Sequence, residues 1–464
     1  MAKIKFSIKL SANRFYRRDR WVGLDENQPS LNAPLGLRKF LHCADKGMDG
    51  LQPPLRIWSM KAVSYIFERR NMRSIYSLVL LVGISSLACT LWAAENHKGE
   101  DFTGRSFSNK DLTDAVFKGC TLDNARFNQT VGAKASFEGS KGKNVNFTAM
   151  QITDVNFKDT DFPQADFRNG DLRSSSYKKA NLEGANFAST VLLDAAFDGA
   201  NLTKANFSES KFNEKISFAK ANLTGATFKN NSLEQSDFSK ANLTDAVFTA
   251  VKFEGADFSG ATVTNINLAE SNLTNADLSH LKFSNANFSS TALVETNLKG
   301  STFVNSKFDK SEFQYTKMTN ASFDHGSFNN SSFYRVELDG VNFSGSAMTG
   351  STFDMKSLEK VNFHGAVMER AKFTVDKISK ADFSGANLKF ADFSGTQLFN
   401  CDFTGADLSN ARFDNAFITA CDFSGANLST VFWEADNLKK NISNGETRFP
   451  RSYSPNPSQM RSTH

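Results

Sequence analysis

Histidine is the first residue type in this sequence that could bind a metal or transfer a proton. The six histidines are scattered along the chain, and only His325 and His364 fall on the same side of the repeat pattern, roughly 10 Å apart. That separation is too large for a shared metal ion without further ligands, and no cysteine or carboxylate cluster has metal-ligand spacing. We therefore predict solvated surface histidines and no metal site.

Acidic residues recur directly before bulky apolar residues, at Asp382, Asp392, Asp402, Asp407 and Asp422. Paired carboxylates can act as acid and base where a cleft moves their pKa values apart. The sequence shows no such cleft, no phosphate-binding glycine loop and no Ser/His/Asp arrangement. We predict no catalytic residue, no cofactor and no enzymatic activity, and we interpret these acids as surface residues that shape turns.

Three of the five cysteines, Cys120, Cys401 and Cys421, stand where the pattern expects a small inward side chain. Cys401 and Cys421 are one repeat of twenty apart, which would place their Cα atoms ~5 Å apart, within disulfide range. Export would permit such a bridge. The alternative is that both are free thiols filling positions usually held by alanine.

A five-residue repeat positions all of these side chains. Residues 381–415 read ADFSG ANLKF ADFSG TQLFN CDFTG ADLSN ARFDN, with a bulky apolar residue at the centre of each pentad and a small one two places before it. A period of five fits neither an α-helix nor a half-buried strand. A short fixed period indicates a solenoid whose unit cannot bury its own apolar face.

The identity of the bulky residue recurs every twenty residues, so four pentads should make one coil. Equivalent phenylalanines should then stack as ladders on two opposite walls of a narrow four-sided tube. One wall is predicted to hold Phe303, Phe323, Phe343, Phe363, Phe383, Phe403 and Phe423; the opposite wall is predicted to hold Phe353, Phe373, Phe393 and Phe413 and to end at Trp433, which we expect to cap the open core. The pattern predicts about 17 coils and a rod of roughly 80 Å.

These pentads resemble the pentapeptide-repeat family, whose pattern is A-(D/N)-(L/F)-x-x, over about three quarters of the chain. The resemblance implies an all-β fold, a right-handed quadrilateral β-helix. It implies no particular function, because one fold serves many roles.

The frame is irregular at three places. Gly132 and Gly142 stand at centres, which predicts a thinner wall there. Pro163 follows a centre, where the chain should turn and need no ladder hydrogen bond. One residue is inserted between Phe212 and Phe218, which predicts a bulge or a partner site.

Outside the repeats, predicted at 95–440, we expect a basic, poorly ordered leader at 1–73 and a flexible tail at 441–464. Residues 74–94 carry no charge and are long enough to span a bilayer with a hydrophobic helix. They could equally be a cleaved signal peptide if translation starts at Met60 or Met72 instead of Met1. A lipid-anchored Cys89 and a buried cap for the rod are weaker alternatives.

The net charge of +5 comes from the leader, and the repeats are close to neutral. A near-neutral rod disfavours nucleic-acid binding. We therefore expect a non-enzymatic, exported bacterial scaffold that binds an unknown protein partner. It would lie in the periplasm, anchored in the inner membrane through residues 74–94 if these stay uncleaved, or be secreted. Two alternatives are a secreted effector acting on host cells and, from the family resemblance, a DNA-mimicking topoisomerase inhibitor.

Overall fold

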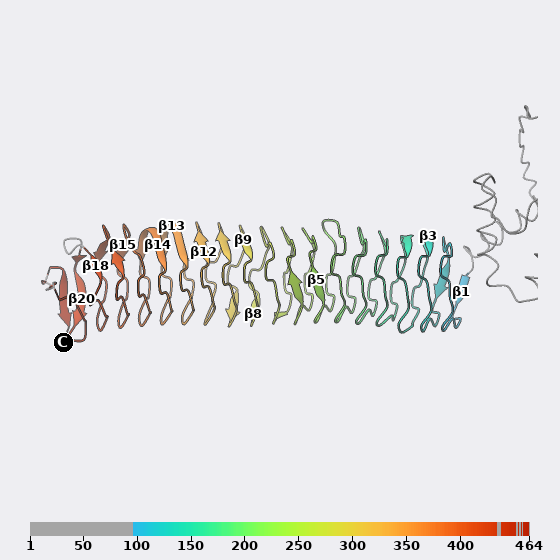
Figure 1. Cartoon of the computed structure of the whole chain (residues 1–464), viewed down its shortest axis with the longest axis horizontal. Coiled ribbons are helices and arrows are strands. Elements are labelled where there is room, and N and C mark those ends of the chain that lie inside the picture. The colour runs from blue at the N-terminus through green and yellow to red at the C-terminus, as the bar shows by residue number, and fades with distance from the viewer. Residues whose placement is uncertain (1–95, 434–437, 452, 454–455, 457, 464) are drawn as a thin grey trace, which may run out of the picture. The chain divides into compact units, whose positions relative to one another are not determined.

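The computed structural model describes residues 96–433, 438–451, 453, 456 and 458–463 as a long, narrow stack of coils (Figure 1). The leader predicted at 1–73 and the apolar segment predicted at 74–94, including Cys89, lie outside the described residues. Among the residues that are described, no helix is long and apolar enough to cross a membrane.

Short strands form the sides of the coils, and nearly all of them have two to four residues because the chain turns at the end of each side. The strands are β1 (Asn96–Lys98), β2 (Val116–Lys118), β3 (Val131–Ala133), β4 (Gln151–Thr153), β5 (Thr227–Lys229), β6 (Val247–Thr249), β7 (Val263–Thr264), β8 (Lys282–Ser284), β9 (Ala292–Val294), β10 (Thr302–Val304), β11 (Glu312–Gln314), β12 (Ser332–Tyr334), β13 (Thr352–Glu359), β14 (Lys372–Ser379), β15 (Gln397–Phe399), β16 (Arg412–Phe413), β17 (Phe417–Thr419), β18 (Phe432–Trp433), β19 (Leu438–Lys439), β20 (Asn441–Asn444) and β21 (Met460–Thr463).

Apart from the coil with the inserted residue and the last coils, each coil takes twenty residues, as predicted. Strand pairing is parallel with that offset, for example Phe313↔Phe333, and isolated bridges such as Asp382↔Asp402 repeat it. The stack has about 18 turns, one more than predicted. The difference arises at the C-terminal end, where Asp422 pairs with Ile442 of β20 and β20 pairs with β21. The solenoid therefore continues beyond Lys440, where the sequence pattern placed its end, and into the predicted tail. Right-handed winding remains an expectation from the family resemblance.

Corners lie two residues after each bulky centre, where the backbone enters the left-handed region: φ is 59° at Asn109, 57° at Lys204 and 67° at Gly405. The residue directly before the centre supports the turn, since the Asp402 carboxylate accepts a hydrogen bond of 2.8 Å from the backbone N–H of Thr404. The same contact recurs at Asp382, Asp392, Asp407 and Asp422. The acids predicted to shape turns therefore do so.

The core is a pair of aromatic ladders, and the prediction of stacked rings is confirmed. Phe373 and Phe393, one coil apart, are stacked with centroids 4.4 Å apart, and Phe393 meets Phe383 of the opposite wall edge-to-face at 5.8 Å. Both contacts are favoured by the charge distribution of aromatic rings. All of the predicted ladder phenylalanines are buried: Phe303, Phe323, Phe343, Phe353, Phe363, Phe373, Phe383, Phe393, Phe403, Phe413 and Phe423.

The aromatic ladders change walls along the rod. In the N-terminal half the stacked rings form two other columns, which include Phe187 on Phe207 at 4.9 Å and Phe238 on Phe258 at 5.2 Å. The second of these columns continues beyond Phe258 as Leu278 and Leu298. The two walls that carry the aromatic columns in the N-terminal half are thus not the two that carry them at the C-terminal end.

Gly132, Gly142 and Pro163 keep the twenty-residue register of the coils around them. At Gly142 a Cβ atom would lie 2.6 Å from the backbone carbon of Leu122, so the backbone itself occupies part of the missing side chain's space. Gly132 keeps its place in the ladder by pairing with Ile152. Pro163 lies in a turn and contributes only its carbonyl, which accepts from the Asn144 N–H at 3.3 Å.

One corner is absent in two successive coils. β13 and β14 each run for eight residues through the place where a turn is expected (Figure 1). Met355 and Val375, at the turn position, point inward and are buried, and Lys356 and Asp376, at the small inward position, are exposed. The pentad frame predicts instead that residues 355 and 375 are exposed and that residues 356 and 376 are buried. Burying two charged side chains in an apolar tube would be far more unfavourable than losing two turns, so the backbone straightens.

Candidate functional site

The histidines do not come together in the structure. His325 forms a 3.0 Å contact with Asp324, and the ring of His364 is 2.8 Å from the Ser384 hydroxyl, both on the exposed surface. Among the described residues no group of three or more His, Cys, Asp or Glu side chains could hold a metal ion. These two histidines lie on the surface, where they were predicted.

Cys120, Cys401 and Cys421 are buried as predicted, and in the structure all three are free thiols. The Cys401 thiol donates to the Phe399 carbonyl at 3.5 Å, and the Cys421 thiol donates to the Thr419 carbonyl at 3.6 Å. Burial raises the pKa of the Cys421 thiol and also that of Cys120. Raised pKa values keep the Cys120 and Cys421 thiols protonated, whereas a hydrogen bond with the Cys421 thiol lowers the pKa of Cys401.

Trp433 lies near the C-terminal end of the core. Its ring is 6.3 Å from Phe423 and 5.2 Å from Tyr453, a residue of the predicted tail. Trp433 is partly buried against the core together with Phe449 and Tyr453. The end of the tube is therefore covered by Trp433 and by aromatic residues that the sequence pattern did not assign to it.

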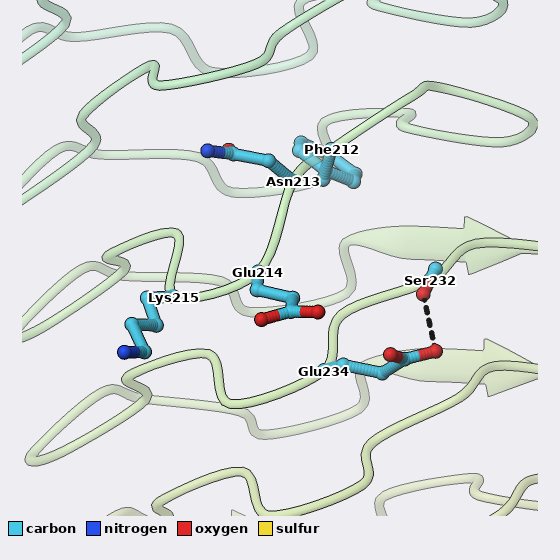
Figure 2. A pocket seen from close by; sticks show the side chains of 6 residues that line it. All are labelled: Phe212, Asn213, Glu214, Lys215, Ser232 and Glu234. Carbon is cyan, nitrogen blue, oxygen red and sulfur yellow. Dashed lines mark hydrogen bonds between the residues drawn. The ribbon is translucent and has the colours of Figure 1, made fainter.

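The inserted residue between Phe212 and Phe218 produces an open hollow on one wall. Figure 2 shows its six lining residues: Phe212, Asn213, Glu214, Lys215, Ser232 and Glu234. The Ser232 hydroxyl donates to the Glu234 carboxylate at 2.9 Å, and Asn213 exchanges two hydrogen bonds with Asp194 of the preceding coil. The lining of the hollow thus carries two carboxylates, one ammonium group and one hydroxyl, and the hydroxyl of Ser232 is paired with Glu234.

The insertion also interrupts the backbone ladder on that wall. The other three walls keep their pairs across the insertion, at Ala196↔Ser217, Asn201↔Asn222 and Asn206↔Thr227, but within the described residues no bridge joins Lys211 to Ser232. The buried Asn231 side chain bonds instead to the carbonyls of Ser210 and Phe207, at 2.8 and 2.9 Å. The side-chain amide of Asn231 thus replaces the missing backbone donor at the insertion.

Large apolar side chains on the outer surface are concentrated in the C-terminal half. In the part of the chain that the structure describes, Val131 is the one exposed large apolar residue ahead of residue 300, and the others are Val304, Tyr315, Val367, Phe390, Phe417 and Phe432. Phe417 and Phe432 are 52% and 56% exposed. Single apolar residues scattered over a protein surface are normal and need no explanation. Here all of them except Val131 lie in one half of the rod, so their distribution does need one.

In the same half, three aromatic rings each make a cation–π contact with an arginine or lysine side chain. The Arg335 guanidinium lies 5.1 Å from the Tyr334 ring centroid, Arg370 lies 5.2 Å from Phe390, and the Lys377 ammonium lies 5.3 Å from Phe399. Cation–π contacts at exposed sites contribute about 0.5–1 kcal/mol each. They hold both partners in defined positions on the surface.

Family comparison agrees with the coil geometry. The family model described as "Pentapeptide repeat region" matches residues 110–187, 200–278 and 306–383, and the model described as "Pentapeptide repeats (8 copies)" matches residues 179–214, 286–324, 377–405 and 391–429. The chain belongs to the pentapeptide-repeat family. No curated protein matches it.

Solved structures of other pentapeptide-repeat proteins are similar to this chain. HetL from the cyanobacterium Nostoc sp. strain PCC 7120, involved in heterocyst differentiation regulation, is 16% identical; the alignment covers 61% of this chain and 89% of HetL, with a TM-score of 0.16. QnrB1, a plasmid-mediated fluoroquinolone resistance protein, is 18% identical over 45% of this chain and 92% of its own, with a TM-score of 0.21. A protein from the Arabidopsis thaliana thylakoid lumen is 25% identical over 24% of this chain and 68% of its own, with a TM-score of 0.13. These likenesses concern the fold alone.

The regular pentapeptide-repeat pattern also explains why some surface residues were not predicted from the sequence. Tyr315, Tyr334 and Arg335 were not predicted as site residues, because the frame assigns them to ordinary corner positions. The straightened corner left a sequence signal, the charged Lys356 and Asp376 at a position that otherwise holds small side chains. Those two departures could have directed attention to this corner.

Proposed function

We propose that this pentapeptide-repeat protein is a non-enzymatic scaffold that binds another protein along the C-terminal half of its solenoid. The observation that supports the proposal is the restriction of exposed large apolar residues, with one exception, to the coils from Val304 onward. The same core runs through both halves, so the fold itself requires no such asymmetry. Protein interfaces are enriched in aromatic side chains and arginine, and both are exposed on this half.

A photo-crosslinking amino acid placed along the rod tests this function. We would introduce it at the exposed positions of Phe390 and Phe417, and at the exposed positions of Lys204 and Glu209 in the N-terminal half. We expect one discrete protein crosslinked from the C-terminal positions and none from the other two. Equal crosslinking from both halves, or none from either, would contradict the proposal.

We further propose export to the periplasm, as a membrane-anchored or released protein. This rests on the uncharged segment at 74–94 and the arginines before it, Arg69, Arg70 and Arg73, which the positive-inside rule keeps in the cytoplasm. Mass spectrometry of the mature amino terminus after cell fractionation tests it. A terminus near Glu95 outside the cytoplasm, or an intact leader in the membrane, would support export; an intact leader in the cytosol would favour the effector and topoisomerase-inhibitor hypotheses instead.

A further inference from the structure

Two large side chains lie one above the other in a single corner column of the rod. Tyr315 and Arg335 lie one coil apart, each at the left-handed turn position, with φ of 53° and 50°. A residue other than glycine, asparagine or aspartate costs about 1–2 kcal/mol in this conformation. Elsewhere in the chain the same position holds asparagine, as at Asn285, and also other residue types, as at Lys204 and Glu209, so neither tyrosine nor arginine is needed to make the turn.

Tyr315, Arg335 and the neighbouring Tyr334 form a single surface cluster. The Tyr315 and Tyr334 rings meet edge-to-face with centroids 5.7 Å apart, and the Arg335 guanidinium covers Tyr334 at 5.1 Å. Tyr315 is 45% exposed. Contacts among the three side chains thus hold the cluster together, while the Tyr315 ring remains exposed to solvent.

Arg335 forms no ion pair with any carboxylate among the described residues, and its recorded contact is with Tyr334. Stacking uses the flat face of the guanidinium and leaves its N–H donors at the edge free to bind a carboxylate in bidentate geometry. Arg370, the other arginine stacked on an exposed ring, differs because it already pairs with Glu369. Arg335 is therefore the stacked arginine on this surface with unused donors.

The next two coils continue the sheet on which this cluster lies. β12, which ends at Tyr334, pairs with β13, and β13 pairs with β14, within one continuous sheet of eight strands. The straightened corner presents Asp354 and Lys356 directly beyond the cluster. An aromatic centre with a charged rim is the usual composition of a protein-binding hot spot.

We propose that this surface, the wide corner (Tyr315, Tyr334, Arg335, Asp354 and Lys356), binds a peptide segment of a partner protein that carries a carboxylate next to an apolar side chain. The carboxylate binds the Arg335 guanidinium, and the apolar side chain packs on the exposed face of Tyr315. The inference rests on the proposed scaffold function and names the chemistry of the partner. No covalent step is involved.

Selection from a library of random 12-residue peptides displayed on phage tests this assignment, with the purified full-length protein as the target. We expect enriched peptides to contain Asp, Glu or a free terminal carboxylate beside an aromatic or aliphatic residue. Binding should fall at least tenfold in Tyr315→Asn and Arg335→Glu, and by a smaller factor in Arg335→Lys, which keeps the charge but loses the bidentate geometry. Asparagine suits the left-handed corner, so Tyr315→Asn should fold at least as stably as the wild type.

His280→Asn is the matched control, because it also replaces a side-chain ring at an exposed left-handed corner, with φ of 58°, and lies ahead of the coils proposed to bind the partner. Binding should be unchanged in that variant. Enrichment of basic peptides, no enrichment, or equal binding to Tyr315→Asn and wild type would overturn the assignment. If crosslinking from Phe390 and Phe417 succeeds while the peptide selection fails, the scaffold function stands and the wide corner does not; if both fail, both proposals fall.

Discussion

The side-chain amide of Asn231 donates a hydrogen bond of 2.8 Å to the backbone carbonyl of Ser210 one coil below. In a regular coil, the backbone N–H of the residue before the bulky centre reaches this carbonyl, as the Asn242 N–H reaches Ala221. The inserted residue near Glu214 prevents that contact. Asn231 therefore compensates for an interruption that begins elsewhere in the chain.

Replacing Asn231 by alanine should destabilise the rod. The carbonyls of Ser210 and Phe207 would lose their amide donor inside the core, which typically costs about 1–3 kcal/mol. Urea unfolding followed by circular dichroism measures the change. Ser236→Ala is the control, because the buried Ser236 hydroxyl has no partner in the described structure and its removal should cost nothing. Equal effects of the two substitutions would refute the role of Asn231.

The gap in the backbone ladder between Lys211 and Ser232 should open more readily than the coils around it. No backbone hydrogen bond from the Phe212 or Ser232 N–H is present within the described residues, whereas the Phe207 N–H donates to Thr227 at 2.8 Å. Exchange-protected amides are those held in stable ladders. Hydrogen–deuterium exchange should therefore show faster uptake in peptides covering 212–216 and 232–235 than in those covering 217–228. Uniform protection would mean that the gap is closed in solution.

Tyr177→Phe should stabilise the protein. Tyr177 stacks between Phe157 and Phe197, at 5.0 and 4.7 Å, and its buried hydroxyl lacks a partner in the described structure. Removing an unsatisfied hydroxyl from a ladder of phenylalanines should raise the free energy of unfolding by about 1–2 kcal/mol. Thermal unfolding at pH 7 measures the gain, and a loss of stability would show that the hydroxyl is satisfied by water.

The same tyrosine predicts a pH dependence. Burial raises the pKa of Tyr177 well above 10, so the folded state keeps it neutral. An unfolded tyrosine ionises at about pH 10. Below about pH 10 Tyr177 is neutral in both states and the free energy of unfolding is unaffected. As the pH rises beyond that value, ionisation in the unfolded state lowers the free energy of unfolding of the wild type. The advantage of Tyr177→Phe over wild type should widen between pH 9 and 11 in urea unfolding; a constant difference would contradict the buried, neutral hydroxyl.

Cys401 and Cys421 should resist alkylation in the folded protein. Both side chains are almost fully buried, which keeps iodoacetamide away from either sulfur, and burial also raises the pKa of the Cys421 thiol. We expect iodoacetamide to label both residues only after denaturation, as counted by peptide mass spectrometry. The same spectra distinguish the two alternatives left open by the sequence, free thiols or a disulfide, since a mass two units lower without reductant would mean that Cys401 and Cys421 are bridged.

The sequence by itself determined the coil. A bulky residue every fifth position, with identity recurring every twenty, is a local and periodic signal, and the stacking of Phe383 on Phe403 at 4.9 Å follows from it directly. Residue types before each centre likewise predicted the turns. Such patterns are legible because every coil faces the same geometric demand.

Only the tertiary structure decided the departures from the pattern. Whether the extra residue near Glu214 would break one wall, and which side chain would replace the lost bond, depends on the coil above it. Whether Lys356 and Asp376 would enter the core or force the corner straight depends on the balance between burying a charge and keeping a turn. These outcomes are set by neighbours twenty residues away across the ladder, and no five-residue pattern contains them.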